Sequence, residues 1–419
     1  MSMSTLAVVA LLMVAVSAEG KIECYDGGMK AHLKDMEVSV GEPVVAVVAP
    51  TEVGWGYYQF PGIGRWDDGT LSLTYSAAPD VAESYGSSRG GLLTSKDDGK
   101  TWTPYSGKWG GSGMLLPNGD RIGVSTPKPY KLADLELPEP AGVLVSTYGK
   151  QKYTMYRMTE LQPKLRTIRI SRQKKGSDTR VTEHAWVDDS LALRYSIREI
   201  FPIIWWGNVK VAGDGSLIAG IYPGNMVRED GSLDLKWHIF FYRSTDFGHT
   251  WKIQGRILYQ PDLKADPKGK EHDGFGEPAF EMLADGSFIC VMRTTDGAGI
   301  GPMYSSRSTD MGKTWSKPKA IAENGVLPRL LKLENGILVL SSGRPGVQVR
   351  FSKDGENWTE PLDVIRVTEK DPHKDTCGYT SLVTTGPDRF IIVYSHFKHQ
   401  IEKGEVRKAI IIREIQVSR

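Results

Sequence analysis

An eight-residue motif recurs in this chain and constrains its fold more than any other feature. The motif reads SKDDGKTW at 95–102, STDFGHTW at 244–251 and STDMGKTW at 308–315, with a shorter copy, SKDGENW, at 352–358. Ser, Thr and Asp favour tight turns because their side chains bond nearby backbone groups. Gly supplies a left-handed backbone angle, and Trp offers an apolar face that fixes the turn to its neighbours. We therefore expect a structural role for each Asp, and the repetition predicts a repeat fold.

A second repeat alternates with the first. A dipeptide of Asp or Asn followed by Gly interrupts runs of alternating apolar residues, which is a strong hairpin signal. The copies are Asp68-Gly69, Asn118-Gly119, Asp214-Gly215, Asp285-Gly286 and Asn335-Gly336, with a variant at 384–394. Each of these six hairpins, joined to a hairpin built on the octet, makes a unit of four antiparallel strands. The sequence therefore predicts an all-β fold, a six-bladed β-propeller of four-stranded antiparallel blades.

The interval between Asn118 and Asp214 is the longest between two hairpins. It holds two further hairpin candidates, at 143–158 and 167–181. The interval therefore contains either a large insertion or a seventh blade, and we favour the insertion. Because no stretch rich in Pro, Gly or Ser marks a second domain, we expect residues 19–419 to form a single propeller.

The N-terminus has the pattern of an export signal. An apolar run from Leu6 to Val16 ends in Val16-Ser17-Ala18, a small-residue cleavage pattern, which predicts a signal peptide at 1–18 and a secreted or periplasmic protein. No stretch is long and apolar enough to predict a membrane span. The formal net charge of +2 gives no reason to expect nucleic-acid binding. Three Cys and no zinc-like Cys/His spacing predict neither a disulfide framework nor a metal or other cofactor.

The octets resemble the Asp-box, or BNR, repeats of sialidases, and the order of other motifs extends the resemblance along nearly the whole mature chain. This resemblance implies a retaining glycosidase that removes a terminal acidic sugar from a glycan. A tyrosine attacks the sugar, a glutamate accepts the phenolic proton, an aspartate serves as acid/base, and three arginines bind the carboxylate of the substrate. A tyrosine suits this chemistry because a carboxylate nucleophile would be repelled by the substrate's own carboxylate.

Four residues match the motifs of that family. Tyr379 in GYTSLV resembles the nucleophile, Glu277 in GEPAFEMLADG resembles the glutamate, and Arg293 and Arg344 resemble the second and third arginines. Glu277 and Arg293 flank one hairpin, so we expect them side by side at one rim. A nucleophile and its base must meet, so we expect the Tyr379 hydroxyl within about 3 Å of the Glu277 carboxylate.

The first arginine of the family is missing. Gln59, in the segment YQFP, stands in its place, and an amide cannot pair with the charge of a carboxylate. The loss of a charge-assisted contact costs about 1.5–3 kcal/mol. Arg329, at the start of a later hairpin, is a candidate to compensate for this substrate-binding contact. For the acid/base, residue type favours Asp80 and spacing favours Glu83, so both stay open.

Two other functions are compatible with the sequence. A polysaccharide lyase acting on glycans that contain uronic acid needs a Tyr or His base, for which His272 and His396 are candidates. The missing first arginine favours this hypothesis. A non-catalytic carbohydrate-binding propeller is the third hypothesis, and the joint presence of Glu277, Arg293 and Tyr379 argues against it. No feature indicates an oligomeric state.

Overall fold

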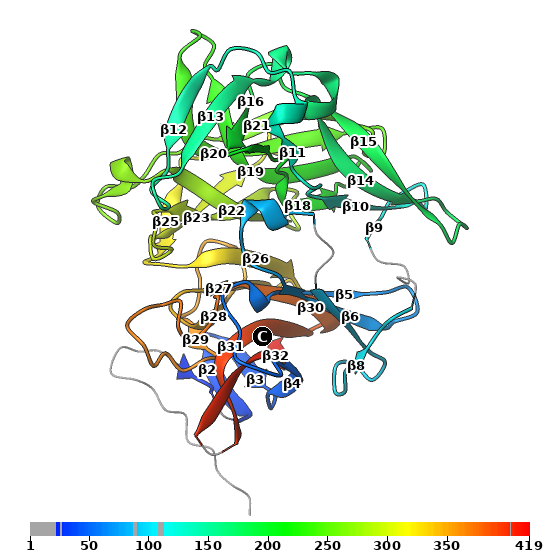
Figure 1. The fold of residues 1–419 in the computed structure, drawn as a ribbon. Helices are drawn as coiled ribbons and strands as arrows, with labels where there is room; N and C mark the ends of the chain where they lie inside the picture. Colours follow the sequence, from blue (N-terminus) through cyan, green and yellow to red (C-terminus); the bar gives the residue numbers. More distant parts are fainter. Residues whose placement is uncertain (1–21, 26, 87–89, 108–112, 403) are drawn as a thin grey trace, which may run out of the picture.

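The computed structural model describes residues 22–25, 27–86, 90–107, 113–402 and 404–419 (Figure 1). The predicted signal peptide lies outside the described residues. The fold is all-β, as expected, because the only helical segments described are short 3-10 turns. These turns are η1 (Ala82–Ser84), η2 (Leu132–Asp134), η3 (Met158–Glu160), η4 (Pro163–Arg166) and η5 (Gly269–Glu271). The part of the chain that the structure describes includes no apolar helix of membrane-spanning length.

Antiparallel meanders of four strands recur along the chain. The first comprises β5 (Tyr57–Arg65), β6 (Leu71–Ala77), β7 (Gly90–Ser95) and β8 (Thr103–Pro104). Later copies comprise β18 (Trp206–Val211), β19 (Leu217–Val227), β20 (Leu233–Ser244) and β21 (Thr250–Ile257); β22 (Gly274–Met282), β23 (Phe288–Thr295), β24 (Met303–Ser308) and β25 (Lys319–Ala322); and β26 (Val326–Lys332), β27 (Leu338–Gly343), β28 (Val347–Ser352) and β29 (Leu362–Asp363). In each meander, the predicted Asp-Gly or Asn-Gly turn joins the first two strands.

The octets occupy one position in these meanders, at the turn between the third and fourth strands. In the copy at 308–315, Ser308 Oγ donates to Asp310 Oδ1 (2.7 Å) and accepts from Gly312 N (2.8 Å). Asp310 Oδ1 also accepts from Thr314 N (2.9 Å), and Trp315 Nε1 donates to Gly312 O (3.0 Å). The Trp315 ring then stacks on Phe241 of the preceding meander, with ring centroids 4.3 Å apart. The structural role expected for the motif is therefore confirmed.

The long interval after Asn118 contains an inserted sheet. Its five strands pair in the order β11 (Tyr130–Lys131), β17 (Ile200–Phe201), β16 (Leu193–Ile197), β13 (Lys152–Arg157) and β12 (Gly142–Val145). The hairpin expected at 143–158 is β12 and β13 in this sheet. The hairpin expected at 167–181 pairs instead with β9 (Met114–Leu115) and β10 (Arg121–Ser125), as β14 (Thr167–Gln173) and β15 (Arg180–Asp188). The two hairpins therefore belong to different sheets.

The number of strands varies from sheet to sheet. Parallel pairings of β15 with β21 and of β20 with β22 join three units into a twelve-stranded sheet. The C-terminal sheet has six strands because β2 (Met29–Leu33), β3 (Met36–Val40) and β4 (Val44–Val48) join β30 (Thr380–Gly386), β31 (Arg389–Glu402) and β32 (Glu405–Ser418), while β1 (Ile22–Glu23) extends the sheet of β29 (Figure 1). No sheet among the described residues closes on itself.

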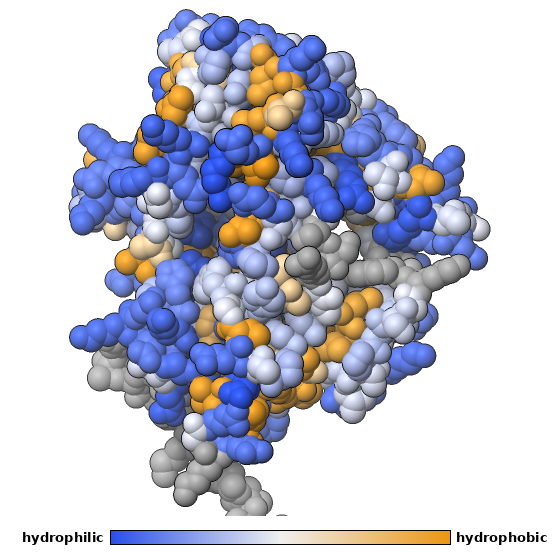
Figure 2. All heavy atoms as spheres, viewed as in Figure 1, coloured by the Kyte–Doolittle hydropathy of each residue, from blue (hydrophilic) through white to orange (hydrophobic). Residues whose placement is uncertain are grey.

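The first strands of successive units converge. Strand β22 contacts β26, β26 contacts β30, and β30 contacts β5. Apolar side chains fill the space between the sheets in several clusters, and Figure 2 shows a mainly hydrophilic surface on which hydrophobic residues form separate patches. The convergence of first strands brings together residues that lie far apart in the sequence.

Candidate active site

Glu277 lies in a bulge of β22. The register between β22 and β23 shifts between Gly276 and Ala279, and Glu277 has a φ of +50°. A left-handed backbone at a residue other than Gly costs roughly 1–3 kcal/mol and is concentrated at functional sites. The bulge therefore identifies Glu277 as a candidate functional residue independently of any motif. Gly276 pairs with Arg293 on β23, so the glutamate and the arginine lie side by side, as the hairpin predicted.

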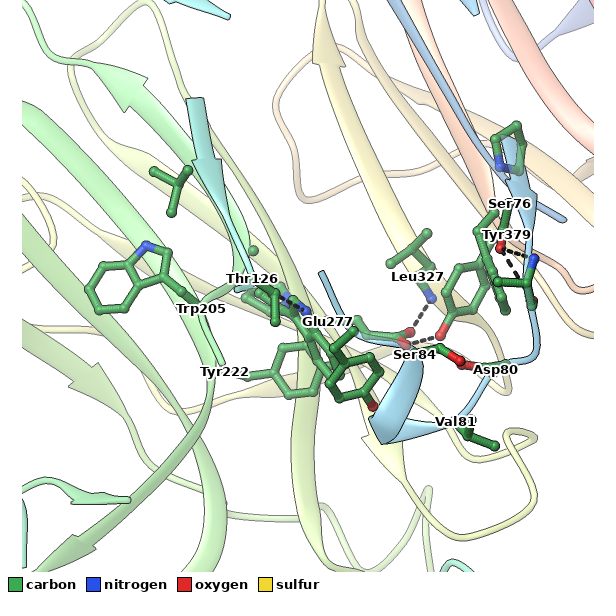
Figure 3. A pocket seen from close by; sticks show the side chains of 18 of the residues that line it. Ser76, Asp80, Val81, Ser84, Thr126, Trp205, Tyr222, Glu277, Leu327 and Tyr379 are labelled. Atoms are coloured by element: carbon green, nitrogen blue, oxygen red, sulfur yellow. Dashed lines mark hydrogen bonds between the residues drawn. The ribbon is translucent and has the colours of Figure 1, made fainter. Parts of the chain in front are cut away.

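Tyr379 stands directly before β30 and points at Glu277. Its hydroxyl donates a hydrogen bond to Glu277 Oε1 (Figure 3). The chain before it passes very close to the end of β27, since a Cβ on Gly343 would lie 2.1 Å from the carbonyl oxygen of Gly378. Burial raises the pKa of Tyr379 well above its ordinary value, and the Glu277 carboxylate acts in the same direction. The phenol is therefore protonated at neutral pH and needs a base to become a nucleophile.

The second carboxylate oxygen of Glu277 is also engaged. Glu277 Oε2 accepts from Leu327 N at 2.8 Å and from Arg293 Nη1 at 3.4 Å. Arg293 is only 5% exposed, and its other nitrogens donate to Thr294 O (3.0 Å) and to the Tyr148 hydroxyl. Burial, the largest single influence, would lower the pKa of Arg293, but the Glu277 carboxylate and three nearby tyrosines together outweigh it and the pKa is raised. Arg293 therefore remains cationic beside the Glu277 carboxylate.

Arg344 is free to hold a ligand in the cavity beside Tyr379. It is 6% exposed, and its Nε donates to Cys377 O at 3.1 Å. The guanidinium lies between two rings, 5.8 Å from the centroid of Tyr379 and 5.7 Å from that of Trp55. Its two Nη nitrogens have no partner among the described residues. Arg344 therefore presents an unpaired fork of donors beside Tyr379.

Two cavities meet at the Tyr379–Glu277 pair. One, the arginine cavity, has a volume of about 400 Å³ and is lined by Arg293, Arg344, Trp55, Tyr148, Trp237 and His373 among others. The other, the aromatic cavity, has a volume of about 650 Å³ and is lined by Phe60, Tyr85, Trp205, Trp206, Leu327 and Arg329 among others (Figure 3). Asp80, Tyr222, Glu277 and Tyr379 line both cavities.

The two acid/base candidates lie in different places. Asp80 is exposed, lines both cavities and accepts a hydrogen bond from Trp55 Nε1 at 2.9 Å. Glu83, in η1, lines neither cavity and pairs with Arg198 at 3.0 Å. Asp80 is therefore the candidate that a bound glycan can reach.

The two candidates for the missing arginine contact lie away from Arg344. Gln59 is fully buried and lines neither cavity; its Oε1 accepts from Gly56 N, and its Nε2 has no partner. Arg329 lines the aromatic cavity but not the arginine cavity. Neither residue is therefore placed to bind the same carboxylate as Arg344.

The histidines considered as lyase bases do not line either cavity. His272 lies 3.1 Å from Asp266, and the His396 ring lies 6.4 Å from that of His399. His373, which the sequence reasoning missed, does line the arginine cavity. Its Nδ1 lies 3.1 Å from Asp371, and burial, followed by the charge of Arg344, lowers its pKa. Nothing in the loop around His373 distinguishes it in a single sequence.

The inserted sheet also contributes to the site, which the sequence did not indicate. The turn between β12 and β13 carries Tyr148, whose hydroxyl contacts Arg293. Asp273, directly before β22, anchors this turn by accepting from Ser146 Oγ (2.6 Å) and Thr147 N (2.9 Å). The described residues contain no group of three or more His, Cys, Asp or Glu suited to a metal ion.

Comparisons with known proteins give one domain match and one curated relative. Residues 206–392 match the model of the BNR repeat-like domain. A sialidase from Bacteroides fragilis (strain YCH46) is 27% identical over 211 residues, which cover 42% of this chain and 36% of that protein, so the match spans only about a third of the relative.

Two solved structures resemble the chain over most of its length. A protein of unknown function from Dyadobacter fermentans DSM 18053 has a TM-score of 0.58 and 17% identity, covering 91% of this chain and 99% of that one. An alpha-L-arabinanase from Penicillium chrysogenum has a TM-score of 0.48 and 16% identity, covering 89% and 98%. The match of residues 206–392 to the BNR repeat-like domain, the match to a sialidase and the repeated octets support a relationship to the sialidase/BNR-repeat superfamily.

Proposed function

We propose that the protein is a retaining exo-glycosidase that removes a terminal acidic sugar, sialic acid or a related sugar, from a glycan. The observation that carries this proposal is the hydrogen bond from Tyr379 to Glu277 beside the unpaired guanidinium of Arg344. A phenol with a raised pKa, a carboxylate that accepts its proton and a free cation together suit nucleophilic attack on an anionic sugar. The 27% identity to a sialidase supports the same class of reaction.

The proposed reaction proceeds in two displacements. In the first, Tyr379 Oη attacks the anomeric carbon and Glu277 takes the phenolic proton. Asp80 protonates the glycosidic oxygen as the bond to the leaving sugar breaks. In the second, Asp80 takes a proton from water, whose oxygen attacks the anomeric carbon. The bond from that carbon to Tyr379 Oη breaks, Glu277 returns the proton to the phenolate, and the acidic sugar leaves with retained configuration. Arg344 and Arg293 bind the carboxylate of the sugar throughout.

The proposal includes the architecture and location expected from the sequence. We propose six blades around the converging first strands, with the five-stranded sheet as an insertion in the second blade. We also propose that residues 1–18 direct export, which would place the enzyme where extracellular glycans occur.

The test is incubation with sialyl-lactose and, separately, with polysaccharides that contain uronic acid. Release of free saturated acidic sugar, abolished in Tyr379→Phe, is the expected result. Absorbance from a new carbon–carbon double bond would instead indicate a lyase. Binding without turnover of either substrate would indicate a carbohydrate-binding protein.

A further inference from the structure

Arg329 lines the aromatic cavity without forming an ion pair there, although the charge of Glu277 acts on it from a distance. Its one hydrogen bond runs from Nε to Thr380 O at 3.3 Å, and no described carboxylate forms an ion pair with it. Its Nη nitrogens have no partner, yet they are not among the polar atoms sealed inside the protein. Among other arginines of low exposure, Arg172 and Arg256 pair with Glu183 and Asp189. Arg194, Arg350 and Arg413 also form no ion pair with a described carboxylate, but they line neither the aromatic nor the arginine cavity.

An unpaired guanidinium in such a place indicates an anionic ligand. Removing a charge from water is costly unless a partner of opposite charge replaces the lost hydration. Burial lowers the pKa of Arg329, although a guanidinium stays protonated at any physiological pH. Thr380 O fixes Nε, so the two Nη nitrogens remain for a carboxylate or a sulfate, whose geometry matches the arginine fork.

The walls around Arg329 suit a sugar ring. Tyr85 and Trp206 have ring centroids 5.1 Å apart, and Trp206 and Tyr222 have centroids 5.7 Å apart. Trp206 Nε1 donates to Thr126 Oγ1 at 3.0 Å, which fixes the indole. Aromatic faces pack against the C–H groups of sugars, and the volume of about 650 Å³ lies within the usual range of ligand pockets.

The position of the aromatic cavity assigns it to the leaving side of the substrate. Asp80, the proposed acid, lines both cavities, so the glycosidic oxygen that it protonates lies between them. If the acidic sugar fills the arginine cavity, the leaving sugar extends into the aromatic cavity. Resting on the proposed function, we propose that this leaving sugar carries a second anionic group, a carboxylate or a sulfate ester, which Arg329 binds.

The test compares three substrates that share one terminal acidic sugar. Sialyl-lactose has a neutral leaving sugar, sialyl-lactose sulfated on galactose has a sulfate, and disialyl-lactose has a carboxylate. We expect Arg329→Gln to lower kcat/KM by about 10–100-fold on the anionic leaving sugar it recognises, and to change it less than about twofold on sialyl-lactose. The charged substrate on which the loss occurs shows whether Arg329 binds a sulfate or a carboxylate. An equal loss on all three, or no loss on any, would overturn the proposal.

Two controls keep the result interpretable. Arg350→Gln, at an arginine of low exposure that lines neither cavity, should leave all three activities unchanged. If Arg329→Gln does not fold, Arg329→Lys keeps the charge and removes the fork, and the same selective loss is expected.

The inference is separable from the proposed activity. If the wild-type protein hydrolyses none of the three substrates, the proposed function fails. Calorimetric titration with lactose sulfated on galactose and with a glucuronic acid disaccharide then measures the aromatic cavity alone. A Kd at least about tenfold weaker in Arg329→Gln than in the wild type, for either probe, supports the second anion site. Equal affinity in both proteins, or no binding to the wild type, rejects it.

Discussion

The Tyr379 hydroxyl donates a hydrogen bond to Glu277 Oε1 across 102 residues of sequence. Leu327, on the strand between them, donates its backbone N–H to the other oxygen of the same carboxylate. Three converging first strands, β22, β26 and the start of β30, therefore share one acidic group. This convergence explains how Glu277, Tyr379 and Arg293 can meet although Tyr379 lies far from the other two in the sequence.

Removing the attacking oxygen should abolish turnover and leave the fold intact. In Tyr379→Phe the ring stays packed against Phe60, and Glu277 keeps its contacts with Arg293 and Leu327. We expect kcat on sialyl-lactose to fall by at least about 10³-fold with an unchanged Tm. The kcat of Glu277→Gln should fall by about 10²–10⁴-fold because an amide cannot accept the phenolic proton. Near wild-type turnover of folded Tyr379→Phe would eliminate the covalent tyrosine mechanism.

The two arginines of the arginine cavity should respond differently to truncation. Arg293→Ala leaves the Glu277 carboxylate, itself 6% exposed, without its charged partner, so a loss of about 3–5 kcal/mol in stability is expected. An exposed arginine could be removed without loss of folding, but Arg293 is 5% exposed. Arg344→Ala removes one hydrogen bond to a backbone carbonyl and two ring contacts, but breaks no ion pair with a described carboxylate.

Arg344→Ala is therefore the cleaner test of carboxylate binding. It should fold normally and raise KM for an acidic substrate by about 10–100-fold, since a charge-assisted contact is lost. Thermal melting and steady-state kinetics on both variants check the contrast. A normal KM for folded Arg344→Ala, or wild-type stability for Arg293→Ala, would contradict these roles.

The sequence predicted the repeated hairpins and the pairing of Glu277 with Arg293 more successfully than the other residues that line the two cavities. Asp-Gly turns and octets act locally, so each hairpin could be placed from its own residues. Glu277 and Arg293 could be paired because one hairpin register connects them. Tyr148 and His373 could not be placed, because the inserted sheet and a loop bring them in through contacts that no local pattern encodes. Trp206 begins β18 of a repeated meander, but no local pattern shows that it lines the aromatic cavity.

Gln59 illustrates the limit of motif matching. Alignment with the first arginine suggested a residue that faces the substrate. The bulged backbone of β5, with positive φ at Tyr58 and Phe60, instead buries Gln59 and leaves Phe60 to line the aromatic cavity. A register shift of this kind depends on tertiary packing and is not encoded in the motif.

His373 should make binding of an acidic substrate depend on pH. Burial and the charge of Arg344 lower its pKa below 6.5, while Asp371 opposes the shift. The ring is therefore neutral at pH 7 and gains a positive charge in the arginine cavity only as the pH falls below 6.5. We expect the KM of the wild type to decrease as the pH falls through that range. The KM of His373→Gln should not show this decrease. Identical pH profiles of KM for both proteins would exclude the role.

The lowered pKa of His373 also makes the stability of the protein depend on pH. The unfolded chain protonates His373 at a higher pH than the folded protein does, because the folded pKa is lowered. The contribution of neutral His373 is therefore complete above pH 6.5 and is lost as the pH falls through the folded pKa. The Tm of His373→Gln should decline less than that of the wild type between pH 7 and pH 5. A steeper decline in the variant would show that the sign is wrong.

Asp273 should couple the inserted sheet to the site. Its carboxylate is 4% exposed and holds the turn that carries Tyr148, and Tyr148 in turn contacts Arg293. Asp273→Asn has one acceptor oxygen instead of two, so at least one of these hydrogen bonds is lost. We expect a stability loss of about 1–3 kcal/mol and a KM several-fold higher for the acidic substrate. Tyr148→Phe should raise KM in the same way with little loss of stability.

Asp266→Asn is the matched control, because Asp266 is also buried, bonds a single side chain and lines neither cavity. It should lower Tm and leave KM unchanged. If Asp273→Asn and Asp266→Asn lose similar stability and both keep the wild-type KM, the inserted sheet only stabilises the fold. A rise in KM confined to Asp273→Asn and Tyr148→Phe would instead show that the turn between β12 and β13 positions Arg293 for the substrate.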